Sequence, residues 1–357
     1  MTNYLLAGGG TAGHVNPLLS LADFIKAQEP NAEVIALGTR EGLEANLIPA
    51  RGYRLEFVAK LPFPRRPSGY ALTFPAKFFR AVGQVRKIIR ENQIDVVVGF
   101  GGYASAPAYL AAKMERKALV IHEANALPGI ANKIGAKLTN RVAVAFAGTP
   151  LPGAIFVGMP LRKEIEDVAV NRNQTAARKH FGLDPESLTL LVTGGSLGAK
   201  RINDTVEVSR DLLLAAGIQV LHIVGGKSEL PPLKQKGYLR ISYCDRMDLA
   251  ISAADFAISR AGAATVSELT AIGVPALYLP YSVGNGEQVV NLKTVIGAGG
   301  GITKSDIEFD RDYVARELVP LLSSSKRLKE MAKAAKSIGI LDGTSKLYEL
   351  VRGVLTK

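Results

Sequence analysis

Residues 4–14 read YLLAGGGTAGH, and this stretch decides the fold of the first half of the 357-residue chain. A short apolar run ends directly in a glycine-rich turn, and an amphipathic segment at residues 18–28 follows it. Gly8, Gly10 and Gly13 satisfy the G-x-G-x-x-G pattern, in which backbone N–H groups approach an anion at the start of a helix. The stretch therefore predicts a buried parallel strand, a tight turn and a crossover helix.

The same alternation of apolar runs with amphipathic segments continues along the chain and restarts near its middle. The expected strands lie at residues 4–7, 34–37, 96–98 and 119–121, and then at 188–192, 220–224, 256–258 and 275–279. A helix is expected at residues 76–91, and a Pro/Gly-rich stretch at 148–153 predicts the linker. This order predicts two doubly wound α/β domains, which would share a cleft at the carboxyl ends of their strands. The expected domains are residues 1–158 and 159–340, followed by a C-terminal helix in 341–357, for which packing back on the N-terminal domain is one option.

Composition and charge narrow the class of protein. With 47% hydrophobic and 21% charged residues, the chain is typical of a globular protein. Its single cysteine, Cys244, cannot form an intrachain disulfide, which favours a cytosolic compartment. The net charge of +12 favours an anionic partner, such as nucleic acid, an acidic membrane or a phosphorylated substrate. No apolar stretch reaches the ~20 residues of a transmembrane helix, and the N-terminus is not typical of a signal peptide.

Two further glycine loops follow expected strands. The loop at residues 193–199, TGGSLGA, is expected to bind an anion, whereas GFGGY at 99–103 is compatible with either a phosphate site or a simple bend. The first loop of the chain also fits a dinucleotide site. In that interpretation Arg40 would meet the 2′-phosphate of NADP, although no acidic residue stands at the tip of the second strand.

Two side chains beside these loops are candidates for chemistry. His14 lies at an expected helix start, where the helix dipole keeps an imidazole neutral and able to accept a proton. The alternative is a structural histidine that bonds the loop backbone. Glu268 could hold both hydroxyls of a ribose, or it could be a capping or surface residue near a helix start. His122 is interpreted as a core histidine, and the scattered histidines and cysteine show no spacing for a metal site.

A basic, apolar stretch between residues 57 and 90 carries eight positive charges and no acidic residue: Lys60, Arg65, Arg66, Lys77, Arg80, Arg86, Lys87 and Arg90. The pattern predicts a surface that lies on an anionic membrane, formed by Phe74, Lys77, Phe79, Arg80 and Lys87. The alternative places the apolar stripe of Phe78, Val82, Val85 and Ile89 in the core and the charges in solvent. Nucleic acid is not expected as a partner, because the charge is localised and no nucleic-acid-binding motif is present.

Several ordered motifs together resemble one family. They are residues 8–14, GFGGY at 99–103, HEAN at 122–125, MPLR at 159–162, GGSLGA at 194–199, RAGAATVSE at 260–268 and EQ at 287–288. With these motifs the chain resembles, over essentially its whole length, the MurG family of peripheral-membrane N-acetylglucosaminyltransferases in glycosyltransferase family 28. The resemblance implies a GT-B fold, with two Rossmann-like domains that face each other across a cleft. The first would be the acceptor and membrane side and the second the donor side.

The resemblance also implies an activity. N-acetylglucosamine would move, with inversion, from UDP-GlcNAc to the C4 hydroxyl of the N-acetylmuramoyl unit of lipid I, which gives lipid II at the cytoplasmic face of the cell membrane without a metal or other cofactor. The residues implied for the donor are Thr11, Ala12, Gly13, Asn125, Arg162, Ser196, Cys244, Ala263, Ala264, Thr265, Val266, Ser267, Glu268 and Gln288. His14 is the preferred base, and Gly101, Gly102 and Tyr103 are expected to meet the acceptor diphosphate.

This chain departs from the family pattern at Ala12, Met159 and Glu287, where the family often has Gly, Asn and Gln. The change at Glu287 puts one sugar or nucleotide contact in doubt. Three other functions stay open: a different GT-B glycolipid glycosyltransferase, a UDP-GlcNAc 2-epimerase and an NADP-binding protein.

Overall fold

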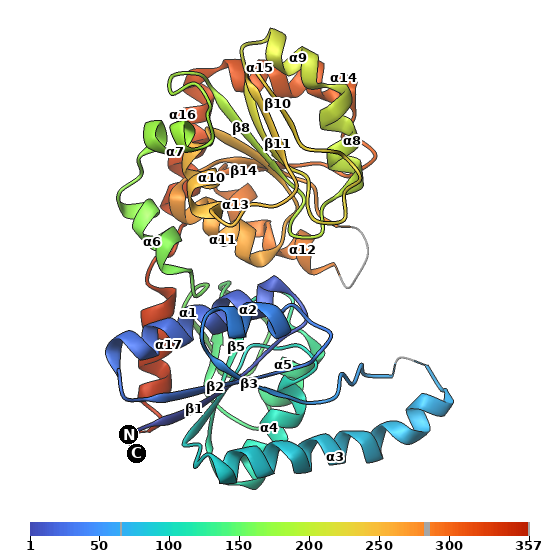
Figure 1. Cartoon of the computed structure of the whole chain (residues 1–357), viewed down its shortest axis with the longest axis vertical. Coiled ribbons are helices and arrows are strands. Elements are labelled where there is room, and N and C mark those ends of the chain that lie inside the picture. Colours follow the sequence, from blue (N-terminus) through green and yellow to red (C-terminus); the bar gives the residue numbers. More distant parts are fainter. Residues whose placement is uncertain (65, 282–285, 356–357) are drawn as a thin grey trace. The chain divides into compact units, whose positions relative to one another are not determined.

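The structure is a computed structural model that describes residues 1–64, 66–281 and 286–355 (Figure 1). Arg65 of the basic stretch therefore lies outside the described residues. The chain divides into two compact units: unit 1 is Met1–Arg162 with the chain from Asp342 onward, and unit 2 is Lys163–Leu341. Residues 159–162, assigned above to the second domain, belong to unit 1, where the Thr344 hydroxyl donates to the carbonyl of Leu161 at 3.2 Å.

Unit 1 contains a seven-stranded parallel sheet in the order β3-β2-β1-β4-β5-β6-β7. Its strands are β1 (Asn3–Ala7), β2 (Glu33–Gly38), β3 (Arg54–Phe57), β4 (Val96–Gly99), β5 (Ala118–Glu123), β6 (Val142–Val144) and β7 (Ala154–Phe156). The chain runs outward from β1 to one edge and then returns to build the other edge. This order confirms the predicted doubly wound sheet.

Helices cover both faces of this sheet. They are α1 (Ala12–Gln28), α2 (Glu44–Ala50), α3 (Gly69–Glu91), α4 (Ser105–Met114), α5 (Ile130–Gly135) and α17 (Gly343–Arg352). Because side chains alternate along a strand, Leu6 of β1 packs in the core with α1 and α17, whereas Leu5 packs in the opposite core with α3 and α4. The C-terminal helix α17 lies on α1, where the Tyr348 and Phe24 rings are 5.2 Å apart.

The Pro/Gly-rich stretch at residues 148–153 is not a linker, so that prediction is wrong. It forms the turn between β6 and β7, and Gly148 and Gly153 adopt φ values of +78° and +65° in it. The chain leaves unit 1 only after Arg162. The sequence pattern missed β7 because this edge strand is exposed along its length and has no buried apolar run.

Unit 2 repeats the architecture with the order β10-β11-β9-β8-β12-β13-β14, in which β10 and β11 are antiparallel and all other pairs are parallel. Its strands are β8 (Thr189–Thr193), β9 (Gln219–Ile223), β10 (Leu233–Gln235), β11 (Tyr238–Ile241), β12 (Phe256–Ser259), β13 (Ala276–Tyr278) and β14 (Gly301–Thr303). The second predicted doubly wound sheet is thus confirmed as well.

The helices of unit 2 are α6 (Lys163–Val170), α7 (Gln174–His180), α8 (Lys200–Val208), α9 (Arg210–Ala215), α10 (Met247–Ala253), α11 (Ala263–Ile272), α12 (Glu287–Asn291), α13 (Lys293–Gly297), α14 (Arg311–Tyr313), α15 (Val319–Ser323) and α16 (Ser325–Ser337). A π-helical turn, Val314–Leu318, joins α14 to α15. In the described part of the chain, no helix combines the length and the apolar character needed to cross a bilayer.

Candidate functional site

Each sheet has one point where the strand order reverses, and ligands of doubly wound folds bind at the carboxyl ends of the strands there. In unit 1 this point lies between β1 and β4, and in unit 2 between β8 and β12. The glycine loops after β1 and β4 therefore meet at one edge. The loops after β8 and β12 meet in the same way in unit 2, so each unit brings together two of the predicted motifs.

His14 lies in the first turn of α1, whose N-cap is Thr11. Its Nδ1 is 3.0 Å from the carbonyl oxygen of Gly9. Because a carbonyl oxygen only accepts, the ring donates from Nδ1–H and the lone pair is on Nε2. A Cβ built on Gly101 would lie 3.1 Å from Nε2, so this nitrogen faces the loop after β4. One ring nitrogen thus bonds the loop backbone, as expected of a structural histidine, and the other faces the loop after β4.

The loop after β4 has the backbone that only glycine adopts readily. Gly101 and Gly102 have φ values of +90° and +83°. A Cβ on Gly102 would lie 2.4 Å from the carbonyl oxygen of Gly9, so the two loops of unit 1 pack closely. The Nζ of Lys60 lies 5.6 Å from the centre of the Tyr103 ring and adds a positive charge beside this loop. The close packing of the two loops explains the glycines structurally, and the nearby positive charge is also compatible with a phosphate site.

The first glycine loop does not bind an anion through Gly8 and Gly10. The amide of Gly8 donates to the carbonyl of Leu37 at 3.0 Å, and the amide of Gly10 donates to Glu44 Oε2 at 2.7 Å. A carboxylate behind the loop also repels a pyrophosphate electrostatically. The dinucleotide-binding interpretation is wrong for this reason, and the guanidinium of Arg40 instead lies 4.4 Å above the centre of the Phe57 ring.

The HEAN motif spans the end of β5 and the loop that follows. His122 is fully buried and its Nε2 is 3.1 Å from the carbonyl of Gly158; burial lowers its pKa to about 4, as expected of a core histidine. Glu123 accepts from the amide of Asn125 at 2.8 Å and holds this loop. Asn125 does not cap a helix, because α5 begins only at Ile130. Asn125 lies at the same sheet edge as His14, because it follows β5 as His14 follows β1.

Arg162 lies outside this motif. It is the last residue of unit 1, directly before α6.

In unit 2 the loop after β8 leads into α8. Gly195 and Gly198 both adopt a φ of +88°, and a Cβ on Gly198 would lie 2.3 Å from the carbonyl oxygen of Val224. The exposed Ser196 accepts from the amide of Gly226 through its own carbonyl at 2.9 Å. The loops after β8 and β9 therefore support each other at this edge.

The small-residue motif opens α11, whose N-cap is Gly262. Glu268 lies in the second turn of this helix and is only 8% exposed, so it is neither a cap nor a surface glutamate. Ala263 and Val266 are buried, while Ala264, Thr265 and Ser267 are half-buried. The helix thus presents small and polar side chains, with one buried carboxylate, at the carboxyl edge of the sheet.

Two other predicted residues of unit 2 lie at the same edge. The Oε1 of Gln288 accepts from the amides of Ala261 and Tyr281 at 3.2 and 2.9 Å, which fixes the orientation of this side chain. Cys244 is 9% exposed in the loop after β11. Within residues 1–64, 66–281 and 286–355, no three His, Cys, Asp or Glu side chains could hold a metal ion together.

Helix α3 divides into a packed and an unpacked half. Val82, Val85 and Ile89 are buried, which confirms that part of the apolar stripe belongs to the core. Leu72 and Phe79 are 85% and 61% exposed, and the N-terminal half of α3 extends beyond the rest of unit 1 (Figure 1). Lys77, Arg80 and Lys87 are exposed, and Phe74 is half-buried. Arg86 and Arg90 are ion-paired to Glu115 at 2.6 and 2.7 Å, so this carboxylate offsets one of their two charges.

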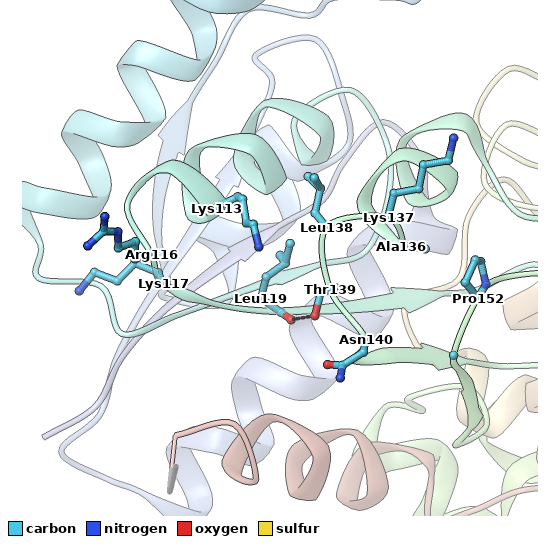
Figure 2. A pocket seen from close by; sticks show the side chains of 11 residues that line it. Lys113, Arg116, Lys117, Leu119, Ala136, Lys137, Leu138, Thr139, Asn140 and Pro152 are labelled. Carbon is cyan, nitrogen blue, oxygen red and sulfur yellow. Dashed lines mark hydrogen bonds between the residues drawn. The ribbon is translucent and has the colours of Figure 1, made fainter.

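A basic pocket of about 900 Å³, not anticipated from the sequence, lies at the C-terminal ends of α4 and α5 (Figure 2). We define it by its four cationic side chains, Lys113, Arg116, Lys117 and Lys137; no acidic side chain lines it. In the sequence, the run KMERK at residues 113–117 indicates a local concentration of positive charge. Only the fold, however, brings Lys137 beside it.

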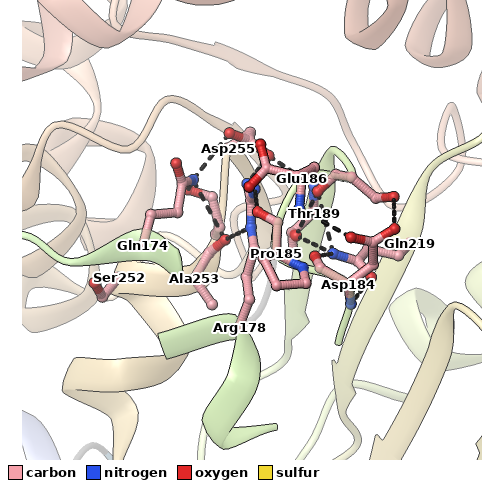
Figure 3. Close-up of polar contacts among 12 residues, drawn as sticks. Gln174, Arg178, Asp184, Pro185, Glu186, Thr189, Gln219, Ser252, Ala253 and Asp255 are labelled. Carbon is pink, nitrogen blue, oxygen red and sulfur yellow. Dashed lines mark hydrogen bonds and ion pairs between the residues drawn. The ribbon is translucent and has the colours of Figure 1, made fainter. Parts of the chain in front are cut away.

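Asp255 lies at the opposite, amino edge of the unit 2 sheet and is structural (Figure 3). Its carboxylate accepts from Arg178 at 2.6 Å, from the side chain of Gln174 at 2.9 Å and from the amide of Thr189 at 2.7 Å. The Arg178 side chain is 7% exposed. This network ties α7 to the first strand of the sheet.

We expect the Asp255→Ala substitution to lower the free energy of unfolding of unit 2 by about 3 kcal/mol, because it leaves the Arg178 guanidinium buried without its partner. Urea denaturation of the full chain measures the loss. The control is Asp211→Ala, which removes a carboxylate that is 88% exposed and should cost less than about 1 kcal/mol. Equal losses in the two variants would contradict the role of this network.

Stability should also depend on pH through two buried histidines. His222 donates from Nε2 to Asn203 and accepts from the Tyr238 hydroxyl, and burial lowers its pKa to about 3; that of His122 is lowered to about 4. Because an unfolded histidine has a pKa of about 6.5, the unfolded chain takes up protons first as the pH falls. The free energy of unfolding should therefore fall below pH ~6.5 by about 1.4 kcal/mol per pH unit for each histidine. The free energy of unfolding is measured by urea denaturation at several pH values. Its slope against pH should be smaller in a His222→Gln variant, whereas a His180→Gln control, at an exposed histidine, should match the wild type.

Comparison with known proteins identifies the family of this chain. The model of the glycosyltransferase family 28 N-terminal domain matches residues 4–144, and the model of its C-terminal domain matches residues 189–347. A protein of Clavibacter sepedonicus named UDP-N-acetylglucosamine–N-acetylmuramyl-(pentapeptide) pyrophosphoryl-undecaprenol N-acetylglucosamine transferase is 54% identical over 353 residues, 99% of this chain and 96% of that protein. A protein of the same name from Leifsonia xyli subsp. xyli is 53% identical over 99% of this chain and 98% of its own length.

Solved structures agree with the architecture. The crystal structure of MurG from Acinetobacter baumannii matches with a TM-score of 0.78 and 23% identity, covering 99% of this chain and 100% of that chain. A UDP-N-acetylglucosamine 2-epimerase matches with a TM-score of 0.66 and 13% identity, covering 100% and 97%. These likenesses show the α/β GT-B fold with its two Rossmann-like domains, and the match to an epimerase shows that the fold alone does not name the reaction. The matches to the two family models and to the relatives establish the family as well as the fold: this chain belongs to glycosyltransferase family 28.

Proposed function

We propose that this protein is an inverting N-acetylglucosaminyltransferase. It moves N-acetylglucosamine from UDP-GlcNAc to the C4 hydroxyl of the N-acetylmuramoyl unit of lipid I, which forms the β1→4 linkage of lipid II for peptidoglycan synthesis. The observation that carries this proposal is the 54% identity, over 99% of the chain, to a relative whose name states the transfer.

The reaction is a direct displacement. The acceptor C4 oxygen attacks C1 of the donor sugar, its proton moves to Nε2 of His14, and the bond between C1 and the UDP oxygen breaks as UDP leaves with its electron pair. The proposal is supported by the lone pair on Nε2, which follows from the Nδ1–H bond to Gly9.

Unit 2 binds the nucleotide in this proposal. Glu268 takes the ribose hydroxyls, and the loop at Ser196 and the start of α8 meet the diphosphate. We also assign a positive charge for the diphosphate to Arg162, the last residue of unit 1. The uracil lies against residues 263–267 with Cys244, and the NH₂ group of Gln288 reaches the donor. We assign contacts with the donor sugar to residues 11–13 and Asn125 of unit 1. Positive charge and backbone amides would stabilise the leaving UDP without a metal ion.

The acceptor's diphosphate binds at Gly101, Gly102 and Tyr103. Support comes from the left-handed backbone of the two glycines, from the start of α4 just after the loop, and from Lys60 beside Tyr103. The amides of Gly8 and Gly10 take no part, because both already donate within the protein.

The enzyme acts at the cytoplasmic face of the cell membrane as a peripheral protein, held there by anionic lipid. Phe74, Lys77, Phe79, Arg80 and Lys87 of α3 form the contacting surface. The exposed apolar side chains of the projecting half of α3 support this assignment. The basic pocket provides further positive charge near the C-terminal end of α4, the helix against which α3 packs.

Reversing the charge at three positions, Lys77→Glu, Arg80→Glu and Lys87→Glu, should weaken binding to vesicles with anionic lipid by roughly 10²-fold or more, since each basic residue contributes about 1 kcal/mol. Co-sedimentation with vesicles measures the binding. The matched control reverses Lys326, Lys329 and Lys333, three exposed lysines of α16 in unit 2, and should bind much more like the wild type. If both triple variants bind equally, the membrane surface lies elsewhere.

The test of the function is the release of UDP from UDP-GlcNAc with and without a lipid I analogue, with the product identified by mass spectrometry. Release that depends on the analogue, with one added N-acetylhexosamine, is the expected result. Conversion of UDP-GlcNAc without any acceptor would instead indicate an epimerase. Transfer to diacylglycerol but not to the analogue would indicate another glycolipid glycosyltransferase.

A further inference from the structure

Glu44 is a buried carboxylate that none of the chemistry above uses. It begins α2, shortly after β2, and its exposed fraction is 0%. Its Oε2 accepts from the amide of Gly10 at 2.7 Å, and its Oε1 accepts from the amide and the hydroxyl of Thr39 at 2.9 and 2.8 Å. Two backbone amides and one hydroxyl therefore replace the water that this group loses on burial.

The space around this carboxylate exists because three neighbours have no side chain. A Cβ on Gly9 would lie 2.2 Å from Oε1 and one on Gly42 would lie 2.0 Å from Oε2. A Cβ on Gly38 would lie 2.5 Å from Cγ of Glu44. The glycines of the first loop and of the segment after β2 thus form a pocket for one carboxylate rather than for an anionic ligand.

The Gly10 amide is one half of the peptide group whose carbonyl belongs to Gly9. That carbonyl accepts from Nδ1–H of His14 at 3.0 Å. One peptide group therefore connects Glu44 to His14 by two hydrogen bonds in series. A carboxylate at the N–H end polarises the peptide, and its oxygen becomes a stronger acceptor for the imidazole N–H.

We propose that Glu44 is a positioning residue for His14 and acts through the Gly9–Gly10 peptide group. It keeps the ring proton on Nδ1, so that Nε2 faces the acceptor hydroxyl. It also stabilises the positive charge that His14 gains when Nε2 takes the proton. A carboxylate does the same for histidine in the Ser-His-Asp triad, but by direct contact. This inference rests on the proposed role of His14 as the base.

The test uses the full-length protein labelled with ¹⁵N-histidine, in which the signals of His14 are assigned from their loss in a His14→Gln variant. In the wild type at neutral pH the ring should carry its proton on Nδ1. If the proton is on Nε2 instead, the proposal fails whatever the variants do. This measurement needs no catalysis, so it stands even if His14 is not the base.

Glu44→Gln keeps the shape of the side chain but removes its charge and one acceptor oxygen. We expect the Nε2–H tautomer of His14 to gain population, kcat for transfer to fall by roughly 10- to 100-fold, and KM for UDP-GlcNAc to stay within about twofold. The matched control is Thr39→Val, which removes a hydrogen bond on the Oε1 side only. It should lower Tm without moving the tautomer or kcat.

Two results would overturn the proposal: an unchanged tautomer in Glu44→Gln, or losses of kcat that merely follow Tm in both variants. The double variant Glu44→Gln/His14→Ala separates this proposal from the proposed function. If Glu44 acts through His14, kcat of the double variant should be no lower than kcat of His14→Ala alone. If His14→Ala itself keeps a near-normal kcat, the assignment of the base is wrong, while the NMR result still decides whether Glu44 sets the tautomer.

Discussion

Replacing His14 with alanine should lower kcat for N-acetylglucosamine transfer by roughly 10²- to 10⁴-fold, the range that general-base catalysis contributes. The acceptor hydroxyl then has no group to take its proton during the attack on C1. Binding of the donor does not require the proton transfer, so KM for UDP-GlcNAc should change little. Initial rates of UDP release with a lipid I analogue measure both constants.

His180→Ala is the control for this substitution, because His180 is an exposed histidine on α7 of unit 2. It should leave both kinetic constants unchanged. A near-normal kcat in His14→Ala would show that another group accepts the proton, and the search would move to other polar side chains at the same sheet edge.

Replacing Glu268 with alanine should raise KM for UDP-GlcNAc by roughly 10²-fold. The proposed contact consists of hydrogen bonds from two ribose hydroxyls to one carboxylate, and each bond to a charged group contributes about 1.5–3 kcal/mol. The side chain is only 8% exposed, so water cannot readily substitute for the lost acceptor.

A donor that lacks the ribose 2′-hydroxyl makes this prediction specific. The wild type should bind UDP-GlcNAc clearly better than its 2′-deoxy analogue, whereas Glu268→Ala should no longer distinguish the two. If the variant keeps the full preference for the hydroxyl, the ribose is bound elsewhere, and any rise in KM reflects a disturbed α11.

The central strands and glycine loops of both units were predictable from the sequence. Strands such as β1 and β4 are buried on both faces, so they appear as unbroken apolar runs. Edge strands such as β3 and β7 were missed because their exposed positions break that run. The linker prediction failed for a related reason: the turn from β6 to the exposed edge strand β7 has the same Pro/Gly composition as a link between domains.

Sequence alone also determined the candidate residues that follow strands directly, because the carboxyl ends of parallel strands must meet at one edge. It could not determine which loop amides were free. Glu44 reaches Gly10 across 34 positions of the chain, and this contact decides that the first loop binds a carboxylate of the protein itself.

The basic pocket and the orientation of Gln288 depended on the tertiary structure in the same way. Local sequence records periodicity and burial, since these repeat every two or 3.6 residues. Hydrogen bonds and charge clusters between distant segments depend on strand order and on where each helix ends. Only the folded chain therefore shows that Nε2 of His14 faces the loop after β4, and that the Gly9–Gly10 peptide group bonds His14 on one side and Glu44 on the other.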